Sequence, residues 1–100
     1  MTEFDYKQAF SRNIGWVTPA EQETLRQKKV AIAGMGGVGG SHLIVLSRLG
    51  IGKFHIADLD VFEQPNFNRQ YGAAMSTINA PKAATMARTI KDINPEIEVT

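Results

Sequence analysis

The 100-residue sequence contains no cysteine and has almost no net charge. The absence of cysteine excludes disulfides, thiolate zinc sites and a thioester-forming cysteine within these residues. Eleven Lys and Arg residues are balanced by ten Asp and Glu residues, and no basic run is present. The resulting charge of +1 gives no bulk attraction to nucleic acid. A content of 43% hydrophobic and 21% charged residues is ordinary for a globular domain and excludes a disordered chain.

Long apolar runs are also missing. None approaches the roughly 18–20 residues that cross a bilayer. Residues 1–5 are acidic and lack the apolar core of a signal peptide. We therefore expect a cytoplasmic protein that is neither exported nor inserted in a membrane. At about 100–200 residues per domain, the chain has room for one domain at most.

Residues 1–27 are predicted to form an N-terminal helical arm. The segment Thr18-Pro19-Ala20-Glu21 has the pattern of a capping box with proline at the first helical position, and it predicts a helix over Pro19–Gln27. The apolar residues before it, from Phe4 to Trp16, are scattered among polar ones. We interpret them as a short helix and a segment that packs on another surface, with Trp16 in packing or a subunit interface.

Residues 28–100 alternate strand and helix patterns. Val30–Ala33 is typical of a strand buried on both faces, and Ser41–Leu49 is apolar nearly all round, as in a buried helix. Phe54–Asp58 predicts a second strand. An amphipathic helix that Pro81 opens, and a third strand that starts within Glu96–Thr100, complete the pattern.

The predicted fold class is therefore α/β: the first β-α-β-α-β half of a Rossmann-like parallel sheet, preceded by N-terminal helices. A three-stranded parallel sheet with bare edges is a poor independent domain. We therefore expect the domain formed by residues 28–100 to continue beyond residue 100.

A glycine-rich turn joins the first strand to the helix that follows it. In Gly34-x-Gly36-x-x-Gly39, the first glycine permits a tight turn, the second lets backbone approach a phosphate, and the third lets helix and strand pack closely. Met35 is interpreted as a spacer. The helix N-terminus supplies free N–H groups for an anion, and Asp58 ends the next strand, where a carboxylate meets ribose hydroxyls. The pattern predicts nucleotide binding; the alternative is a turn used only for packing.

The polar loop from Leu59 to Thr77 and the start of the second helix indicate which nucleotide binds. Loops of this length in a compact domain are usually functional. A dehydrogenase has no need of Arg69 and Lys82, whereas a triphosphate suits an Arg fork and a Lys point charge. Lys82 also lies in a first helical turn, where the dipole disfavours a cation by about 0.3–1 kcal/mol. A residue against local preference is more often functional; the alternative is a solvated surface lysine.

These segments together resemble the ThiF/MoeB family, which includes the ubiquitin-activating enzymes. The resemblance runs in register over residues 28–95 and rests on Val30–Gly40, Leu49–Gly52, Ala57–Asp60, Asn66–Gln70, Lys82 and Ile93–Pro95. It implies an enzyme, commonly a homodimer, that binds Mg-ATP. Such an enzyme adenylates a carboxylate, commonly the C-terminus of a ubiquitin-like or sulfur-carrier protein, and releases pyrophosphate.

The resemblance also assigns roles to residues. It implies that Arg69, Lys82 and Arg12 are catalytic, with Arg12 reaching the ATP of a partner subunit; the alternative for Arg12 is a surface arginine. The expected nucleotide-binding residues are Gly34, Gly36, Gly37, Gly39, Asp58, Asp60, Asn66, Asn68, Arg69, Gln70 and Lys82. Among these, Asp58 would hold the ribose, and Asn66, Arg69 and Lys82 the phosphates. Asp60 would contact nucleotide or magnesium, or cap the following loop.

No Ser, Cys or His nucleophile is expected within these residues. The substrate carboxylate attacks the α-phosphorus itself, so positioning and cations suffice for catalysis. The magnesium-binding aspartate of the family is expected beyond residue 100, as is the catalytic cysteine of thioester-forming members. His42 and His55 have no second ligand at metal-binding spacing and are interpreted as structural.

Two other functions stay open. A NAD(P)-binding Rossmann oxidoreductase would bind NAD(H) and would not depend on Arg69 or Lys82. A non-catalytic ThiF-like domain would keep the fold and bind a partner. Within the adenylating function, thiamine or molybdopterin sulfur transfer, tRNA-modifying dehydration and protein conjugation are all possible.

Overall fold

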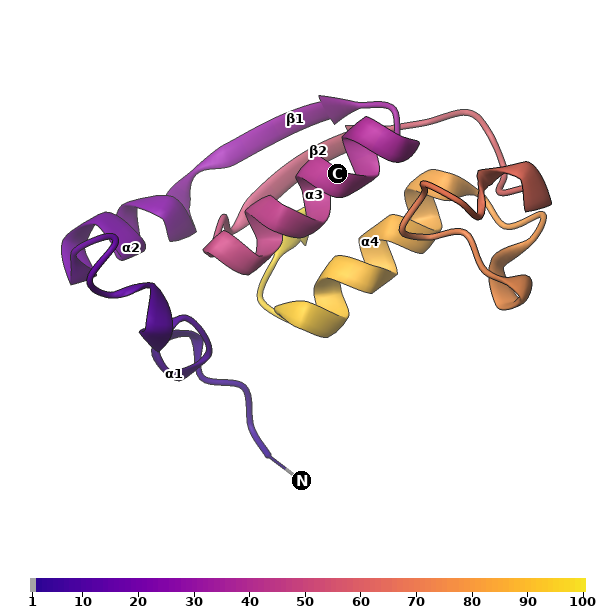
Figure 1. Ribbon diagram of the computed structural model, residues 1–100. Helices are drawn as coiled ribbons and strands as arrows, with labels where there is room; N and C mark the ends of the chain where they lie inside the picture. The colour runs from indigo at the N-terminus through magenta and orange to yellow at the C-terminus, as the bar shows by residue number, and fades with distance from the viewer. Residues whose placement is uncertain (1) are drawn as a thin grey trace.

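The computed structural model describes residues 2–100, in which helices and strands alternate as the sequence predicts (Figure 1). The elements are α1 (Tyr6–Ala9), η1 (Ser11–Asn13), α2 (Pro19–Gln27), β1 (Lys29–Ala33), α3 (Gly37–Leu49), β2 (Lys53–Ala57), η2 (Gln64–Asn66), η3 (Met75–Thr77), α4 (Lys82–Ile93) and β3 (Glu98–Val99). None of the helices in this part of the chain has the length and apolar character needed to cross a bilayer.

The three strands form a parallel sheet in the order β1-β2-β3, which confirms the predicted fold class. The register of the first pair runs from Lys29 opposite Lys53 to Ala33 opposite Ala57. Because both strands run the same way, the residues that follow them emerge at the same edge of the sheet. That edge carries the glycine turn and Asp58.

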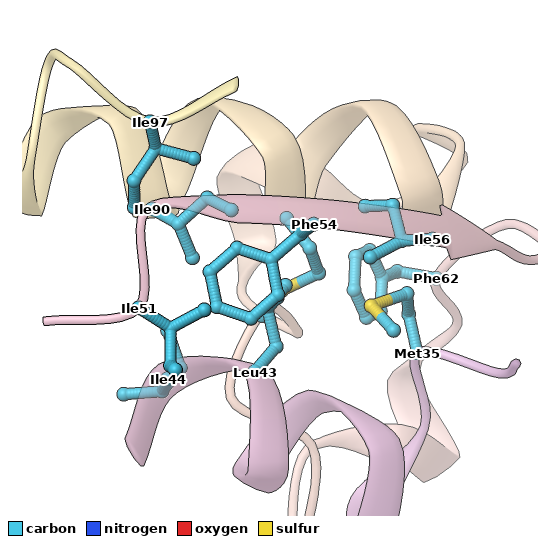
Figure 2. Close-up of a cluster of buried hydrophobic side chains, with 10 residues drawn as sticks. Met35, Leu43, Ile44, Ile51, Phe54, Ile56, Phe62, Ile90 and Ile97 are labelled. Carbon is cyan, nitrogen blue, oxygen red and sulfur yellow. The ribbon is translucent and has the colours of Figure 1, made fainter. Parts of the chain in front are cut away.

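The hydrophobic core lies between β2 and the two helices α3 and α4, which cover one face of the sheet (Figures 1 and 2). Phe54 points from β2 toward Leu43 of α3, and both side chains are fully buried (Figure 2). From α4, Met86 and Ile90 are also fully buried, as the spacing of apolar residues in this helix predicts. The remaining members of the cluster are Met35, Ile44, Ile51, Ile56, Phe62 and Ile97.

Two predictions of burial are wrong. The strand β1 alternates exposed and half-buried residues instead of being buried on both faces. The helix predicted over Ser41–Leu49 is buried on one side only, because Val45 and Leu49 are 61% and 37% exposed. Both errors have one physical cause. An element that is apolar on two faces is expected to have another layer packed on each face, and residues 2–100 supply only one such layer.

The arm packs on the sheet domain at the end of α3. The predicted capping box of α2 is confirmed: Glu21 N–H donates to Thr18 Oγ1, and Thr18 N–H donates to Glu21 Oε1. The buried Tyr6 hydroxyl donates to the Gly50 carbonyl at 2.6 Å and accepts from Gln22 Nε2 at 3.1 Å. Burial raises the pKa of Tyr6 above its ordinary value. These contacts fix the arm to the domain, while the division into residues 1–27 and 28–100 stays a prediction.

The loop between β2 and α4 is held in place by one aromatic side chain. Phe62 is fully buried in the core, its N–H donates to the Ala80 carbonyl at 3.1 Å, and its carbonyl accepts from Asn79 N–H at 3.0 Å. The loop is thus pinned near its start and near its end. Its central part crosses the edge of the sheet that carries the glycine turn.

We expect Phe62→Ala to lower the free energy of unfolding by about 3–5 kcal/mol, because it removes a fully buried aromatic ring and leaves a cavity. Urea unfolding followed by circular dichroism measures this. Phe67→Ala is the matched control in the same loop, since Phe67 is 41% exposed; its cost should be about 1 kcal/mol or less. Equal costs for the two variants would contradict the role given to Phe62.

Candidate functional site

Backbone geometry requires glycine at two positions of the turn between β1 and α3. Gly34 has a φ of +91°, in the left-handed region that favours glycine. A Cβ atom on Gly39 would lie 1.7 Å from the Gly34 carbonyl oxygen, so no side chain fits there. Gly36 differs, because a Cβ atom there would meet no protein atom closer than 3.6 Å. Backbone conformation therefore explains Gly34 and packing explains Gly39, whereas neither requires a glycine at position 36.

Met35 does more than space the glycines. Its side chain is 1% exposed and belongs to the hydrophobic core, near Phe62 and Ile56 (Figure 2). Its N–H group donates to Asp58 Oδ2 at 2.7 Å. The interpretation of Met35 as a spacer is therefore wrong. A long apolar residue among glycines, directly after a strand, was the available signal that the turn is anchored in the core.

Asp58 follows the last residue of β2 and lies against the glycine turn. Besides the Met35 N–H, its carboxylate accepts the N–H of Asp60 at Oδ1, also at 2.7 Å. Short bonds of this kind to an ionised acceptor are stronger than neutral ones. The structure thus brings Asp58 to the turn as the sequence predicts, and the carboxylate is engaged there by two backbone donors.

Two candidate residues of the loop lie over the turn. The Arg69 Cγ atom would be 3.5 Å from a Cβ atom on Gly37, and Gln70 Nε2 would be 3.6 Å from one on Gly36. Arg69 is exposed, and its Nη1 donates to the Pro65 carbonyl at 2.9 Å and to Asn68 Oδ1 at 3.0 Å. Asn68 therefore helps to orient the guanidinium. Gln70 is 7% exposed and its Oε1 has no hydrogen-bond partner within residues 2–100.

Lys82, at the first position of α4, is 7% exposed, so the alternative of a solvated surface lysine is wrong. Its ammonium lies 5.7 Å from the centre of the Phe62 ring. A cavity of about 270 Å³ is lined by Asp60, Val61, Glu63, Asn66 and Lys82. Both ion pairs formed within the described residues belong to Arg26, and neither includes Lys82. The largely buried Lys82 residue therefore shares a cavity with Asp60 and Glu63, and its ammonium forms an ion pair with neither.

The predicted residues gather at one edge of the sheet, with a single exception. Asn66 joins the cavity of Lys82, where its Oδ1 accepts the Glu63 N–H at 2.9 Å. Arg12 is exposed on η1, in the arm at the opposite end of the sheet from the carboxyl edge (Figure 1). One chain therefore does not bring Arg12 to this site, and its action across a subunit interface stays a prediction.

The described residues supply no metal centre. Among residues 2–100, no group of three or more His, Asp or Glu side chains is arranged to hold a metal ion. His55 Nδ1 lies 2.7 Å from Thr100 Oγ1, and His42 is exposed on α3. A larger hollow of about 500 Å³ is lined by arm residues between Tyr6 and Glu23 and by none of the candidate residues. The edge therefore combines a glycine turn with two cations, Arg69 and Lys82, and with the carboxylates of Asp58, Asp60 and Glu63.

Comparison with known proteins identifies relatives of this chain. The ThiF family model matches residues 10–100. The tRNA threonylcarbamoyladenosine dehydratase of Bacillus subtilis is 42% identical over 90 residues, which are 90% of this chain and 35% of that protein. The SUMO-activating enzyme subunit uba-2 of Caenorhabditis elegans is 35% identical over 80 residues, which are 80% of this chain and 14% of that protein.

Among solved structures, the tRNA N6-threonylcarbamoyladenosine dehydratase TcdA of E. coli in complex with ATP superposes with a TM-score of 0.93 at 31% identity. The match covers all of this chain and 42% of that one. The chain thus spans less than half the length of each of these relatives. Its sequence over residues 10–100 and its fold agree in showing that it belongs to the ThiF family.

Proposed function

We propose that the protein binds ATP at the carboxyl edge of its sheet and takes part in the adenylation of a carboxylate. The observation that carries this proposal is Lys82: the residue is 7% exposed, it lines a cavity, and no carboxylate of the described residues forms an ion pair with its ammonium. A cation with little access to solvent and no ion-pair partner favours the binding of an anion. A bound phosphate would supply the missing partner.

The arrangement suits a nucleoside triphosphate. The backbone of Gly36, which only the Gln70 side chain overlies, and the N–H groups at the start of α3 would receive phosphate oxygens. Arg69 and Lys82 would contact the phosphates from the loop and from α4, with Asn66 between them. Asp58 would accept the ribose hydroxyls, since a carboxylate has lone pairs beyond the two that its backbone donors occupy.

The reaction would need no nucleophile from the protein. An oxygen of the substrate carboxylate, ionised at neutral pH, attacks the α-phosphorus, and the bond from that phosphorus to the bridging oxygen breaks. Pyrophosphate leaves with the electron pair, and an acyl-adenylate forms. Lys82 and Arg69 would stabilise the charge that develops on the leaving group. Magnesium would add further charge neutralisation, and its ligand is proposed to lie beyond residue 100.

For the substrate, we favour a carboxylate carried by a modified nucleoside of tRNA. Two of the relatives described above are named as tRNA threonylcarbamoyladenosine dehydratases. The threonyl group in that name has a carboxylate, and removal of water from a carboxylate requires its prior activation. The C-terminus of a ubiquitin-like or sulfur-carrier protein is the second candidate, supported by the similarity to a SUMO-activating enzyme subunit. Either reaction starts with an acyl-adenylate.

Two measurements test this function. Calorimetric titration with Mg-ATP, NAD and NADH should show binding of ATP and of neither dinucleotide; binding of dinucleotide alone would identify an oxidoreductase instead. Pyrophosphate exchange is then measured with tRNA that carries threonylcarbamoyladenosine, with the same tRNA lacking it, and with a carrier protein. Exchange that requires the modified nucleoside supports the favoured substrate, and exchange only with the carrier protein would replace it.

Lys82→Met keeps most of the buried aliphatic stem and removes the charge. We expect it to weaken ATP binding about 10- to 100-fold, the equivalent of one charge-assisted hydrogen bond of about 1.5–3 kcal/mol. Lys91→Met, in the last turn of the same helix, removes an exposed lysine and should leave affinity unchanged. Unchanged ATP affinity in Lys82→Met, measured by calorimetry, would refute the role of Lys82.

Gly36→Ala separates folding from phosphate binding. The new methyl group meets no protein atom closer than 3.6 Å, so the thermal unfolding temperature should change little. The same methyl group occupies the space where a phosphate would approach the backbone, so ATP affinity should fall at least tenfold. Gly39→Ala is the contrasting variant, because its methyl group collides with the Gly34 carbonyl and should destabilise the fold. Normal ATP binding by Gly36→Ala would contradict the proposed path of the phosphates.

A further inference from the structure

Asp58 connects the two segments that carry the proposed phosphate ligands. Its carboxylate accepts the Met35 N–H of the glycine turn and the Asp60 N–H of the following loop, both at 2.7 Å. The Asp60 carbonyl in turn accepts the Lys82 N–H at 3.0 Å. A continuous chain of three hydrogen bonds therefore runs from the glycine turn through Asp58 to the first residue of α4.

These three hydrogen bonds restrain a part of the backbone that its glycines make easy to deform. Gly34, Gly36 and Gly37 have no side chains to restrict the turn, and glycine has more backbone freedom than any other residue. Two restraints oppose that freedom: the Met35 side chain is buried in the core, and the Gly34 N–H donates to the Ala57 carbonyl at 2.7 Å. The Asp58 carboxylate adds the restraint that links the turn to Lys82.

We propose that Asp58 is a positioning residue, which fixes the separation between the glycine turn and the Lys82 ammonium so that both can contact one polyphosphate. This inference rests on the proposed function and goes beyond the ribose contact, because it gives Asp58 an effect on ligands that have no ribose. The two roles are compatible, since an ionised carboxylate offers about four lone-pair sites and the backbone donors use two.

Ribose-free ligands separate the two roles. The affinities of the wild-type protein, Asp58→Ala and Asp58→Asn are measured by calorimetry for ATP, 2′,3′-dideoxy-ATP and inorganic tripolyphosphate. A positioning role predicts that Asp58→Ala loses about tenfold or more in affinity for all three, with a smaller loss in Asp58→Asn, which keeps one acceptor oxygen. Asp92→Asn, an exposed carboxylate on α4, is the charge-matched control and should bind all three as the wild type does.

The opposite result is well defined. Removing a negative charge beside an anion site would by itself tighten tripolyphosphate binding. Unchanged or tighter binding of tripolyphosphate in Asp58→Ala, with weaker binding of ATP alone, would leave Asp58 as a ribose ligand only and overturn the proposal. If Asp58→Ala does not fold, the same comparison is made with Asp58→Asn.

A double-mutant cycle tests the connection to Lys82. If Asp58 acts by placing the ammonium, Asp58→Ala should weaken tripolyphosphate binding less in a Lys82→Met background than in the wild type. Full additivity of the two losses would overturn this step. The unliganded protein gives a separate readout: amide hydrogen exchange at Met35 and Asp60, followed by NMR, should become faster in Asp58→Ala and stay unchanged in Asp92→Asn.

The exchange measurement also separates this inference from the proposed function. A wild-type protein that binds neither ATP nor tripolyphosphate would overturn the function, and the Met35 and Asp60 amides would still decide whether Asp58 holds the two segments. Unchanged exchange at both amides in Asp58→Ala would overturn the positioning role even if ATP binds.

Discussion

Parallel pairing of β1 with β2 is the constraint on which the site depends. With Ala33 opposite Ala57, the residues that follow the two strands, Gly34 and Asp58, must emerge side by side. The Gly34 N–H donates to the Ala57 carbonyl, and the next residue of each segment extends the contact through the Met35 N–H and the Asp58 carboxylate. A shift of one residue in this register would carry Asp58 away from the turn. The position of the proposed nucleotide site is thus a consequence of strand pairing.

The core and the site share their anchors. Met35 and Phe62 are both buried in the hydrophobic cluster, and each belongs to a segment that carries candidate ligands. Met35 fixes the glycine turn from below, while Phe62 fixes the loop and lies 5.7 Å from the Lys82 ammonium. A cation near an aromatic face is stabilised in part, which makes a nearly buried lysine tolerable before any anion binds. Packing of Phe62 therefore holds the Lys82 ammonium in place before the proposed ligand binds.

Much of this was predictable from sequence, for identifiable reasons. Local patterns gave the capping box of α2, the apolar face of α4 and the strand–turn–helix at Gly34–Gly39, because caps, periodicity and glycine spacing depend on near neighbours. Burial of β1 and α3 was overestimated, because an apolar composition shows that a face can be buried but does not show which other segment, if any, packs against it. Two features could not be predicted: the two backbone hydrogen bonds that the Asp58 carboxylate accepts, and the placement of Arg69 and Gln70 over the turn. Both depend on how an irregular loop folds back across the edge of the sheet.

The charge of the chain bears on how a substrate would be selected. A net charge of +1 with no basic run gives little long-range attraction to a polyanion. Asp58, Asp60 and Glu63 surround the same edge as Arg69 and Lys82, so even the local field is mixed. An anion would bind there through a few directed contacts at short range, as a triphosphate does, and not through bulk charge. If the substrate is a nucleoside of tRNA, these residues would bind the ATP that activates it, and affinity for the RNA backbone would have to come from other surfaces of the protein.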